Sequence, residues 1–200
     1  MVASDIHGAA HYCQEMLRAF ERENANKLLL LGDILYHGPR NAIPDDYDTK
    51  DVADMLNKKK NSILCVRGNC DSDVDQMVLE FPIMAEYCLL YVGDKMIFAT
   101  HGHTFNEHKL PPLTQGNILL HGHTHVPAWD NIGDFLYWNP GSVSIPKHGS
   151  RNSYMILTDK ICIWKELNGE AYHSETLEVV NDANGKESTE SSYQHVRLGQ

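Results

Sequence analysis

Leu119-Leu120-His121-Gly122-His123-Thr124-His125 places three imidazoles directly after an apolar run. The run over residues 118–120 predicts a short buried strand, and Gly122 lets the backbone turn sharply at its end. His123 and His125 lie two positions apart, so on extended backbone their side chains point to the same side. Neutral imidazole is the commonest metal ligand among side chains. The stretch therefore predicts either a metal site or a polar turn with incidental histidines.

Polar clusters follow four further apolar runs in the same way. Each cluster combines His, Asp or Asn with a glycine, and each run is typical of a buried strand. In α/β proteins ligands bind at the carboxyl ends of strands, so clusters in this position indicate one shared site. The four clusters are Asp5-Ile6-His7-Gly8, Gly32-Asp33, Gly68-Asn69-Cys70-Asp71 and Thr100-His101-Gly102-His103.

The charge balance limits the classes of partner. The chain has 200 residues, with 17 Lys plus Arg against 27 Asp plus Glu and a formal net charge of −10. This balance argues against an extended nucleic-acid surface and against binding to anionic membranes. No apolar run approaches the roughly 20 residues of a membrane span. A small anionic substrate held by metal ions is compatible with this charge.

The cysteines and the start of the chain bear on its location. Five cysteines are scattered without a CxxC pair, and we see no secretory leader. They predict reduced thiols in a cytoplasmic protein. The chain begins abruptly, with Val2-Ala3-Ser4 as a very short first strand, which leaves open that a few native residues are missing there.

Hydrophobic spacing predicts alternating strands and helices in the first part of the chain and successive strands in the second. We expect helices over residues 11–23, over a segment capped by Thr49, and over 71–81. The strands of the first part are expected at residues 28–31 and 62–66. Those of the second part are expected at 87–91, 96–100, 118–121, 128–132, 135–138, 154–158, 161–167 and 171–180.

This order predicts two sheets packed face to face with helices outside, which is an α/β fold. We expect one domain over residues 1–180. Residues 181–200 are rich in Asn, Ser, Glu and Gly, and they predict a mobile tail.

The five clusters offer more metal ligands than one ion needs. Two divalent ions that share one bridging carboxylate would use them all. Mixed nitrogen and oxygen ligands suit Mn²⁺, Fe or Zn²⁺, and the absence of thiolate ligands argues against a structural zinc site. Two such ions activate water for attack on a phosphate ester. The candidate ligands are Asp5, His7, Asp33, Asn69, His101, His123 and His125.

Taken together, these motifs resemble the calcineurin-like metallophosphoesterases, and the likeness covers the chain from Asp5 to about Ser142. Within that superfamily the chain is most similar to the small bacterial YfcE-type phosphodiesterases. Three segments carry this second likeness: His37-Gly38-Pro39-Arg40-Asn41, Arg67-Gly68-Asn69-Cys70-Asp71 and residues 139–147. The resemblance implies a two-sheet β-sandwich flanked by helices (αββα) and a metal-dependent phosphodiesterase.

The resemblance also implies a role for each matching residue. One ion would be held by Asp5, His7, Asp33 and His125. The other would be held by Asp33, Asn69, His101 and His123, with Asp33 as the bridge. The implied cofactor is a pair of divalent ions, most often Mn²⁺, with Zn²⁺, Fe or Ni²⁺ as alternatives. The residues expected to carry the reaction are Asp33, Asn69, Cys70, Asp71 and His101.

Four further residues are candidates for substrate contacts or for structural roles. Arg40 is a candidate phosphate contact, because its guanidinium matches phosphate oxygens and it lies in a long loop. Arg67 is either a second such contact or a structural ion-pair residue. His103 is either a substrate contact or a polar loop residue, and His121 is expected to be a packed structural histidine.

Cys70 departs from the broader family pattern. Phosphomonoesterases of this superfamily usually carry His after the Asn ligand. A thiol is a weak hydrogen-bond donor and offers no positive charge, which weakens the case for a monoester dianion. A diester carries a single negative charge and asks less of a cationic donor. The alternative is that Cys70 only fills space beside the metals.

Two other functions compete with the diesterase. A phosphomonoesterase of the same fold is disfavoured by Cys70. A protein-binding scaffold is the other alternative, since a eukaryotic retromer subunit resembles this fold. A drifted scaffold should have lost ligands, whereas all seven are present here. The sequence leaves open which diester is cleaved, among a nucleotide diester, a cyclic nucleotide and a glycerophosphodiester, and it is compatible with a homo-oligomer.

Overall fold

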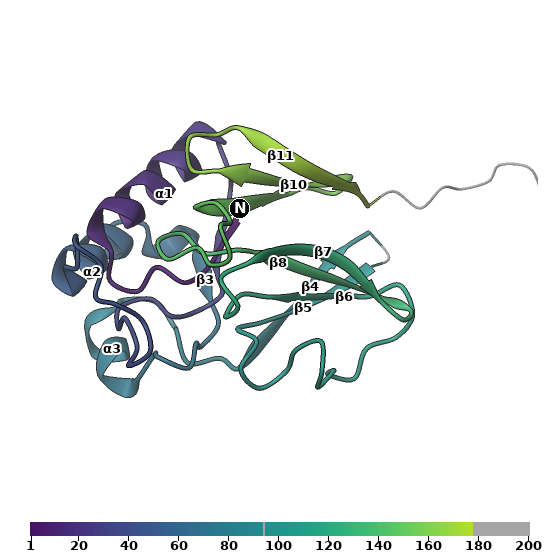
Figure 1. Ribbon diagram of the computed structural model, residues 1–200, viewed down its shortest axis with the longest axis horizontal. Coiled ribbons are helices and arrows are strands. Elements are labelled where there is room, and N and C mark those ends of the chain that lie inside the picture. Colours follow the sequence, from purple (N-terminus) through teal and green to yellow (C-terminus); the bar gives the residue numbers. More distant parts are fainter. Residues whose placement is uncertain (94, 178–200) are drawn as a thin grey trace, which may run out of the picture.

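The computed structural model describes residues 1–93 and 95–177. Two β-sheets pack against each other, and the helices gather at one end of the molecule (Figure 1). The six-stranded sheet has the order β11 (Ala171–Thr176), β10 (Ile161–Glu166), β9 (Ser153–Leu157), β1 (Val2–Ala3), β2 (Leu28–Leu30) and β3 (Ile63–Cys65). The five-stranded sheet has the order β4 (Tyr87–Val92), β5 (Lys95–Thr100), β6 (Ile118–His121), β8 (Phe135–Pro140) and β7 (Pro127–Ile132).

Both sheets mix parallel and antiparallel pairs. β1, β2 and β3 run parallel, with Val2 opposite Leu29 in the register, and β9, β10 and β11 extend the sheet antiparallel. In the second sheet β5, β6 and β8 run parallel, while β4 and β7 are antiparallel edge strands. Parallel neighbours end at the same edge of a sheet, which is what brings the loops after β1, β2 and β3 together.

Successive side chains of β2 point to opposite faces of the sheet and enter two different hydrophobic cores. Leu28 and Leu30 pack with residues of the helices, among them Met16. Leu29 lies on the opposite face, as period-two side-chain direction requires, and packs with residues of the second sheet such as Trp138. The continuous apolar run at this position is therefore explained by burial on both faces.

The helices are α1 (Ala10–Arg22), α2 (Thr49–Asn57), α3 (Asp73–Val78) and a 3₁₀ turn at Lys60–Ser62. The predicted cap of α2 was wrong by one position. Asp48 is the N-cap, and its carboxylate accepts a hydrogen bond from the N–H of Asp51 at 2.9 Å. A carboxylate both satisfies this free donor and favours the positive end of the helix dipole.

α3 is shorter than the predicted helix over residues 71–81. It begins after Ser72, which forms a reciprocal capping box with Asp75, and it ends at Val78. Its apolar residues do not enter the core. Val74, Met77 and Val78 are 69%, 83% and 50% exposed.

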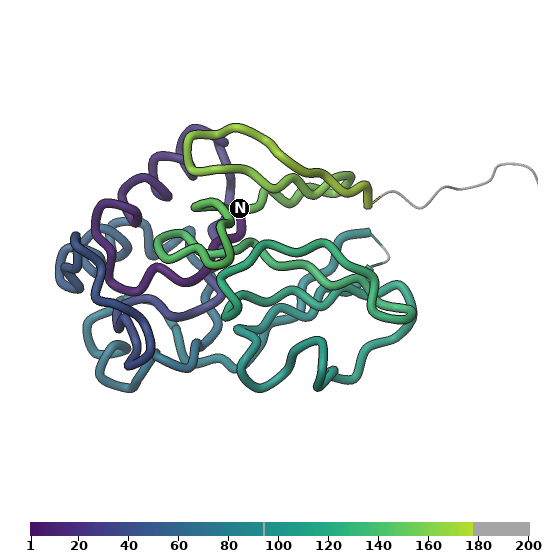
Figure 2. Tube along the Cα trace, in the orientation of Figure 1, coloured from purple at the N-terminus to yellow at the C-terminus, as the bar shows by residue number. Residues whose placement is uncertain are grey.

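The predicted α/β fold with two packed sheets is confirmed, but helices cover only one side of it. Within residues 1–93 and 95–177, the α-helices all precede β4 in the chain. The connection from β5 to β6, residues 101–117, contains Pro111 and Pro112 and runs as a loop along the edge of the molecule (Figure 2). Proline has no N–H and breaks helices, which explains why this crossover is not helical.

The end of the chain is described only in part. β11 ends at Thr176, and the predicted strand over 171–180 extended beyond it. Residues 178–200, which include the predicted mobile tail, lie outside the described residues. The helices that the structure describes are all too short or too polar to cross a membrane.

Candidate metal centre

The structure brings all seven predicted ligands together where the two sheets face each other. Asp5 and His7 follow β1, Asp33 follows β2 and Asn69 follows β3. The ligands of the second sheet, which follow β5 and β6, are His101, His123 and His125. The loops after β1 and β2 are joined by backbone hydrogen bonds, with the N–H of His7 donating to the carbonyl of Asp33 at 2.9 Å.

One group of ligand atoms consists of Asp5 Oδ1, His7 Nε2 and His125 Nε2. The two Nε2 atoms lie 3.3 Å apart. Asp5 Oδ1 is 3.3 Å from His125 Nε2 and 3.6 Å from His7 Nε2. Asp33 Oδ2 lies 3.7 Å from His7 Nε2, which brings it to the edge of the same group.

A second group is centred on His101 Nε2. This atom lies 3.4 Å from Asp33 Oδ2, 3.1 Å from Asn69 Oδ1 and 3.1 Å from His123 Nδ1. Asp33 Oδ2 is therefore near both groups, because it stands between His7 and His101. The bridging role of Asp33 stays a prediction.

Backbone carbonyls fix the tautomers of three of these imidazoles. Nδ1 of His7 donates to the Tyr36 carbonyl at 2.8 Å, that of His101 to Leu31 at 2.7 Å and that of His125 to Ile145 at 2.6 Å. A carbonyl oxygen only accepts, so Nδ1 carries the proton and the neutral ring presents a lone pair at Nε2. When the three rings are neutral, three lone pairs point into one small volume. Outer hydrogen bonds of this kind are typical of metal-ligating histidines.

These contacts fit metal ions better than hydrogen bonds. In their neutral forms the rings of His7 and His125 present lone pairs at Nε2 to each other. Burial opposes protonation of His7, but Asp5 and Asp33 outweigh it and raise its pKa, so a positive charge is favoured at this position. Asp5 Oδ1 is buried, and it has no hydrogen-bond partner among the described residues. Two ligands of one ion with bonds of about 2.0–2.2 Å lie about 3.0–3.6 Å apart, which is the spacing observed. The site's donors are imidazole, carboxylate and amide oxygen, a set that suits Mn²⁺, Fe and Zn²⁺.

Five of the seven ligands have left-handed backbone conformations. Such residues are uncommon outside glycine, although Asp and His tolerate them better than most, and each costs of order 1–3 kcal/mol. Strain of this kind concentrates at functional sites, where the surrounding structure holds it in place. The five φ angles are Asp5 59°, His7 51°, Asp33 55°, His123 65° and His125 62°.

Two glycines are required by close packing behind the ligands. A Cβ on Gly68 would lie 2.1 Å from Asp33 Oδ1, and one on Gly122 would lie 2.0 Å from Ser4 Oγ and 2.7 Å from Asp5 Oδ2. Neither position has room for a side chain. These glycines therefore let the loops of the two sheets approach closely enough to share one centre.

The electrostatics of the site favour cations. Burial opposes ionisation of Asp5 and Asp33, yet hydrogen bonds and charge from neighbouring imidazoles lower the pKa of both carboxyl groups. Burial also opposes protonation of His101, but Asp33 and Asp5 outweigh it and raise its pKa to about 9. Burial and the charge of His101 lower the pKa of His123 to about 4. Two ionised, buried carboxylates thus stand among imidazoles that are in part neutral and free to bind metal.

Asp71 lies behind the centre and faces backbone rather than the ligand volume. It is 2% exposed, and its Oδ2 accepts from the N–H groups of Asp33 and Gly68 at 2.8 and 2.7 Å. Its Oδ1 accepts from the N–H of Ile34 at 2.8 Å. Asp71 therefore holds the loops after β2 and β3 in register and positions Asp33.

Cys70 lies at the rim of the centre with its thiol half-buried. Its N–H donates to Asp33 Oδ1 at 2.8 Å, and the Asn69 amide donates to its sulfur at 3.2 Å. Burial, together with the charge of Asp33, raises the pKa of the thiol to about 12. At neutral pH Cys70 is therefore a neutral thiol, neither a thiolate nucleophile nor a cation.

A small cavity of about 30 Å³ opens beside the ligands. Arg40 lines it, as predicted for a phosphate contact, and so does Lys147. Both are at the same opening as Asp33, His123 and His125 although they come from distant parts of the sequence. The entrance to an acidic centre thus carries two cations.

Of the three remaining candidates, His103 lies near the site, whereas His121 and Arg67 make structural contacts. The His103 ring lies 5.5 Å from that of His101, and burial and His101 lower its pKa. His121 is buried, with its ring nitrogens bonded to Gly122 and Glu107 and its ring stacked on Tyr137. Arg67 donates to the Asp71 carbonyl at 3.3 Å, which is a structural contact.

Sequence reasoning missed several residues that hold the ligands from outside. Ser142 and Ser144 both donate to the Asp5 carbonyl, at 2.9 and 3.0 Å. Lys147 at the cavity was also missed. The segment over residues 139–147 had been noted only as part of a resemblance. The sequence feature that could have indicated this segment is the Pro140-Gly141 turn at the end of β8. The other ligand clusters also follow the ends of strands.

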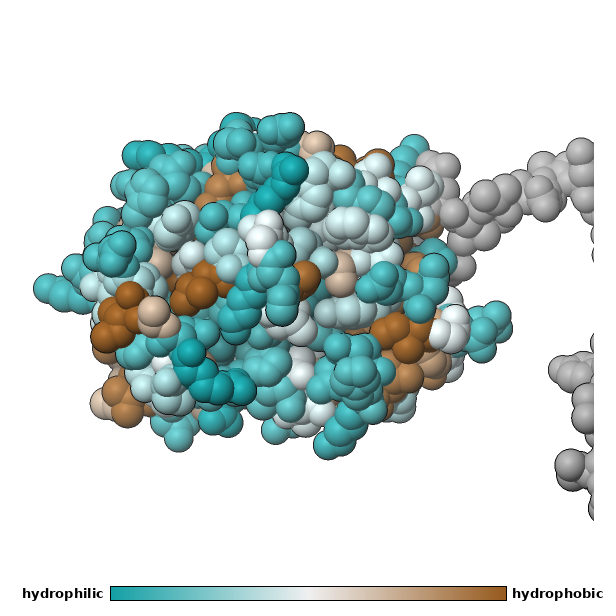
Figure 3. Space-filling model, in the orientation of Figure 1, coloured by the Kyte–Doolittle hydropathy of each residue, from teal (hydrophilic) through white to brown (hydrophobic). Residues whose placement is uncertain are grey.

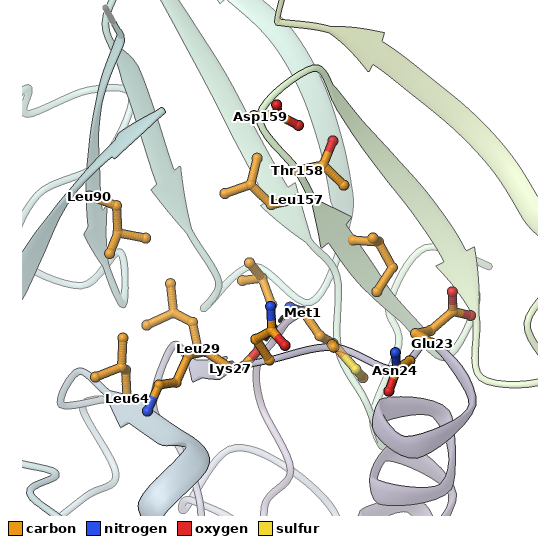
Figure 4. Close-up of a pocket in the computed structure, with 14 residues that line it drawn as sticks. Met1, Glu23, Asn24, Lys27, Leu29, Leu64, Leu90, Leu157, Thr158 and Asp159 are labelled. Atoms are coloured by element: carbon orange, nitrogen blue, oxygen red, sulfur yellow. Dashed lines mark hydrogen bonds between the residues drawn. The ribbon is translucent and has the colours of Figure 1, made fainter. Parts of the chain in front are cut away.

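A separate cavity of about 520 Å³ lies at the amino ends of β1 and β2 (Figure 4). Met1, Leu29, Leu64, Leu90 and Leu157 point into it from both sheets. None of the predicted ligands lines it. It is at the opposite end of the parallel strands from the metal centre and forms no part of that site.

Comparison with known proteins agrees with the motifs. A family model described as a calcineurin-like phosphoesterase superfamily domain matches residues 1–160. Phosphodiesterase YfcE of Escherichia coli (strain K12) is 44% identical over 171 residues, which cover 86% of this chain and 93% of the relative.

Solved structures give the same result. YfcE, described as a phosphoesterase from E. coli, superposes with a TM-score of 0.85 at 41% identity, over 89% of this chain and 98% of that one. Vacuolar protein sorting 29 from Cryptosporidium parvum has a TM-score of 0.57 at 17% identity, over 89% and 96% of the two chains, and shares the fold alone. The family model and the YfcE relative confirm the resemblance, and the chain belongs to the calcineurin-like phosphoesterase superfamily.

Proposed function

We propose that this chain is a metal-dependent phosphodiesterase that cleaves a small diester with two divalent ions at the Asp33 centre. The observation that carries the proposal is the meeting of the His7 and His125 Nε2 atoms, 3.3 Å apart, beside a buried oxygen of Asp5 that has no hydrogen-bond partner among residues 1–93 and 95–177. Family membership and 44% identity to a phosphodiesterase support the reaction class.

The residues divide between two ion positions. Asp5, His7, Asp33 and His125 hold one ion, and Asp33, Asn69, His101 and His123 hold the other. When bound, two such ions lower the pKa of water and offset the negative charge of the phosphate. Mn²⁺ is the proposed metal, because the ligand set mixes imidazole with oxygen and contains no thiolate.

The other residues act on the substrate and on the ligands. Arg40 and Lys147 bind phosphate oxygens at the opening of the cavity, where charge-assisted hydrogen bonds are strong. Burial and the charge of His101 lower the pKa of His103, so its ring is neutral near pH 7. Its one N–H group can donate a hydrogen bond to an ester oxygen. Asp71 keeps the loops in register, as its three backbone contacts indicate.

Cys70 favours diesters over monoesters. A monoester dianion carries one more negative charge, and the protonated thiol adds no cation to offset it. A diester monoanion needs only the ions and the two cations at the cavity. We therefore do not favour the phosphomonoesterase. The scaffold alternative predicted lost ligands, whereas all seven side chains are present and face one volume.

Turnover on matched esters tests the proposed function. The protein is stripped with a chelator, reconstituted with Mn²⁺, Zn²⁺, Fe²⁺ or Ni²⁺, and assayed on bis(p-nitrophenyl) phosphate and p-nitrophenyl phosphate. We expect turnover only with metal, highest with Mn²⁺, and a larger kcat/KM for the diester. Higher kcat/KM for the monoester, or none for either ester with any metal, would contradict the proposal.

The proposed location is the cytoplasm. All five cysteines are free thiols in the structure, and Cys13, Cys65 and Cys162 are buried. Unpaired thiols are typical of a reducing compartment. Fractionation of the source cells with an antibody to this chain tests the location, and a pool confined to an extracellular fraction would contradict it.

A further inference from the structure

The cavity at the metal centre is too small to hold a whole diester. Its volume is about 30 Å³, which is about twice the space that one ordered water needs. Sites that enclose organic ligands usually measure about 300–1,000 Å³. The phosphate can approach the ligands, but an organic substituent must lie elsewhere on the surface.

A groove of about 790 Å³ adjoins the centre, between the loop after β2, α2 and α3. We call it the α2–α3 groove. Cys70 lines both the groove and the metal cavity, so the two spaces adjoin at this side chain. Tyr36 connects them a second time, because its carbonyl accepts from His7 Nδ1. The groove walls include Tyr36, Tyr47, Ala53, Cys70, Val74 and Val78.

The apolar residues of α3 are not buried by any other part of residues 1–93 and 95–177. Val74 and Val78 line the groove and are 69% and 50% exposed. Polar contacts hold α3 in place instead: Gln76 bonds the backbone of Leu79, Phe81 and Ile83, and Ser72 caps the first turn. Figure 3 shows hydrophobic residues at the helical end of the face, as well as others nearer the sheets. Exposed apolar surface grouped next to a reactive centre indicates a binding surface.

The charges in the groove exclude a second phosphate. Its ionisable residues are one lysine, Lys50, and three acids, Asp54, Asp75 and Glu80. Asp75 is engaged in the capping box, and Glu80 pairs with Lys60. An anionic substituent would meet acidic side chains here. An uncharged ring would instead contact two tyrosines and two valines.

We propose that the α2–α3 groove binds the uncharged, planar apolar substituent of a phosphodiester whose phosphate lies at the metal centre. This inference rests on the proposed function and adds to it the class of substrate: diesters with one aromatic group, in preference to small alkyl diesters. The phosphate is fixed by Arg40, Lys147 and the ions, and the ring extends past Cys70 into the groove.

Binding of two slowly hydrolysed diesters to the Mn²⁺-reconstituted protein tests the groove. Diphenyl phosphate and dimethyl phosphate carry the same charge and differ in their substituents. Titration calorimetry should give at least about tenfold tighter binding of diphenyl phosphate, since burying part of a ring removes apolar surface from water.

Two tryptophan variants on α3 distinguish blocking of the groove from a general effect of tryptophan on the helix. Val74→Trp fills the groove and should abolish the preference for diphenyl phosphate, with no change in dimethyl phosphate binding or Mn²⁺ content. Met77→Trp is the matched control, because Met77 is 83% exposed on the same helix and does not line the groove. If Val74→Trp fails to fold, Val74→Asp replaces it, since Asp is favourable in the first turn of a helix.

Each outcome decides between the two proposals. Equal binding of the two esters, or equal behaviour of the Val74 and Met77 variants, overturns the groove and leaves the diesterase intact if bis(p-nitrophenyl) phosphate is hydrolysed. Groove-dependent binding without turnover supports the groove and overturns the diesterase.

Discussion

The Nε2 atoms of His7 and His125 lie 3.3 Å apart, and each ring donates its Nδ1–H in a hydrogen bond to a backbone carbonyl. When both rings are neutral, two lone pairs face each other inside the protein, next to Asp5 Oδ1, which has no hydrogen-bond partner among the described residues. This arrangement is unfavourable without a cation. Metal binding should consequently be coupled to the stability of the whole fold.

Bound metal should raise the melting temperature. At a Mn²⁺ concentration of about 100 times Kd, binding to the folded state alone adds about 2.7 kcal/mol, or roughly 5–10 °C for a chain of this size. Ca²⁺ should have little effect, because it prefers oxygen ligands and this site has four histidines. Differential scanning fluorimetry of chelator-stripped protein measures both. Identical melting with and without Mn²⁺ would argue against a working centre.

Asp71→Asn should loosen the centre without removing a ligand. An amide presents N–H groups to at least one of the backbone donors of Asp33, Ile34 and Gly68, and an unsatisfied buried donor costs about 1–3 kcal/mol. We expect a lower melting temperature and Mn²⁺ affinity reduced by about 10–100-fold. Asp73→Asn on the exposed first turn of α3 is the control. Wild-type Mn²⁺ affinity in Asp71→Asn would remove Asp71 as a positioning residue.

Cys70→His should shift the ester preference toward monoesters. An imidazole can act as a general acid, which is worth roughly 10²–10⁴-fold, and it can offset the extra charge of a dianion. Both oxygens of Asp71 already accept from backbone N–H groups, so the expected shift does not depend on Asp71 orienting the new imidazole. The ratio of kcat/KM on the two p-nitrophenyl esters is the measurement, with Cys70→Ser as a control of similar size. An unchanged ratio in Cys70→His would leave the diesterase standing and show that the thiol only fills space.

Glu23 should stabilise the fold in a pH-dependent way. Burial opposes its ionisation, but Lys165 and Tyr154, both bonded to Oε1, lower its pKa below the ordinary 4.5. A lowered pKa in the folded state means that the contribution is present above about pH 4.5 and is lost as the pH falls through the folded value. Glu23→Gln should therefore cost about 1–2 kcal/mol at neutral pH and little in acid.

Chemical denaturation at several pH values measures this difference. Glu21→Gln on the same helix is the control, because Glu21 is exposed and its pair with Lys59 should contribute little. A Glu23→Gln effect that stays constant into acid would contradict the assignment.

Much of the site could be predicted because its signals are local. Each ligand directly follows a buried strand, and glycine at the strand end allows the backbone to turn. The run at Leu28–Leu30 was predicted as a central strand because burial on both faces leaves no polar alternation. Parallel pairing of β1, β2 and β3 then placed Asp5, Asp33 and Asn69 at one edge.

What the sequence left out depends on contacts between distant segments. The Asp5 carbonyl accepts from Ser142 and Ser144, more than 130 positions away, and no local pattern marks such a pair. Asp71 was expected among the reacting residues, but the direction of its carboxylate is set by the fold of the β2 loop. The predicted helix over residues 71–81 is present only as the shorter α3, on which Val74 and Met77 are exposed, because this helix is held by its caps and side-chain hydrogen bonds.

Metal content of the wild-type and Asp33→Asn proteins tests the shared-carboxylate centre most directly. Both are stripped, reconstituted with Mn²⁺, desalted and measured by mass spectrometry, with circular dichroism to verify folding and with exposed Asp130→Asn as the control. We predict two Mn²⁺ per chain in the wild type and control, and loss of both ions from Asp33→Asn with at least about 100-fold lower diester turnover. Asp33→Asn that retains two ions and wild-type kcat/KM would contradict the bridging role and the two-metal centre built on it.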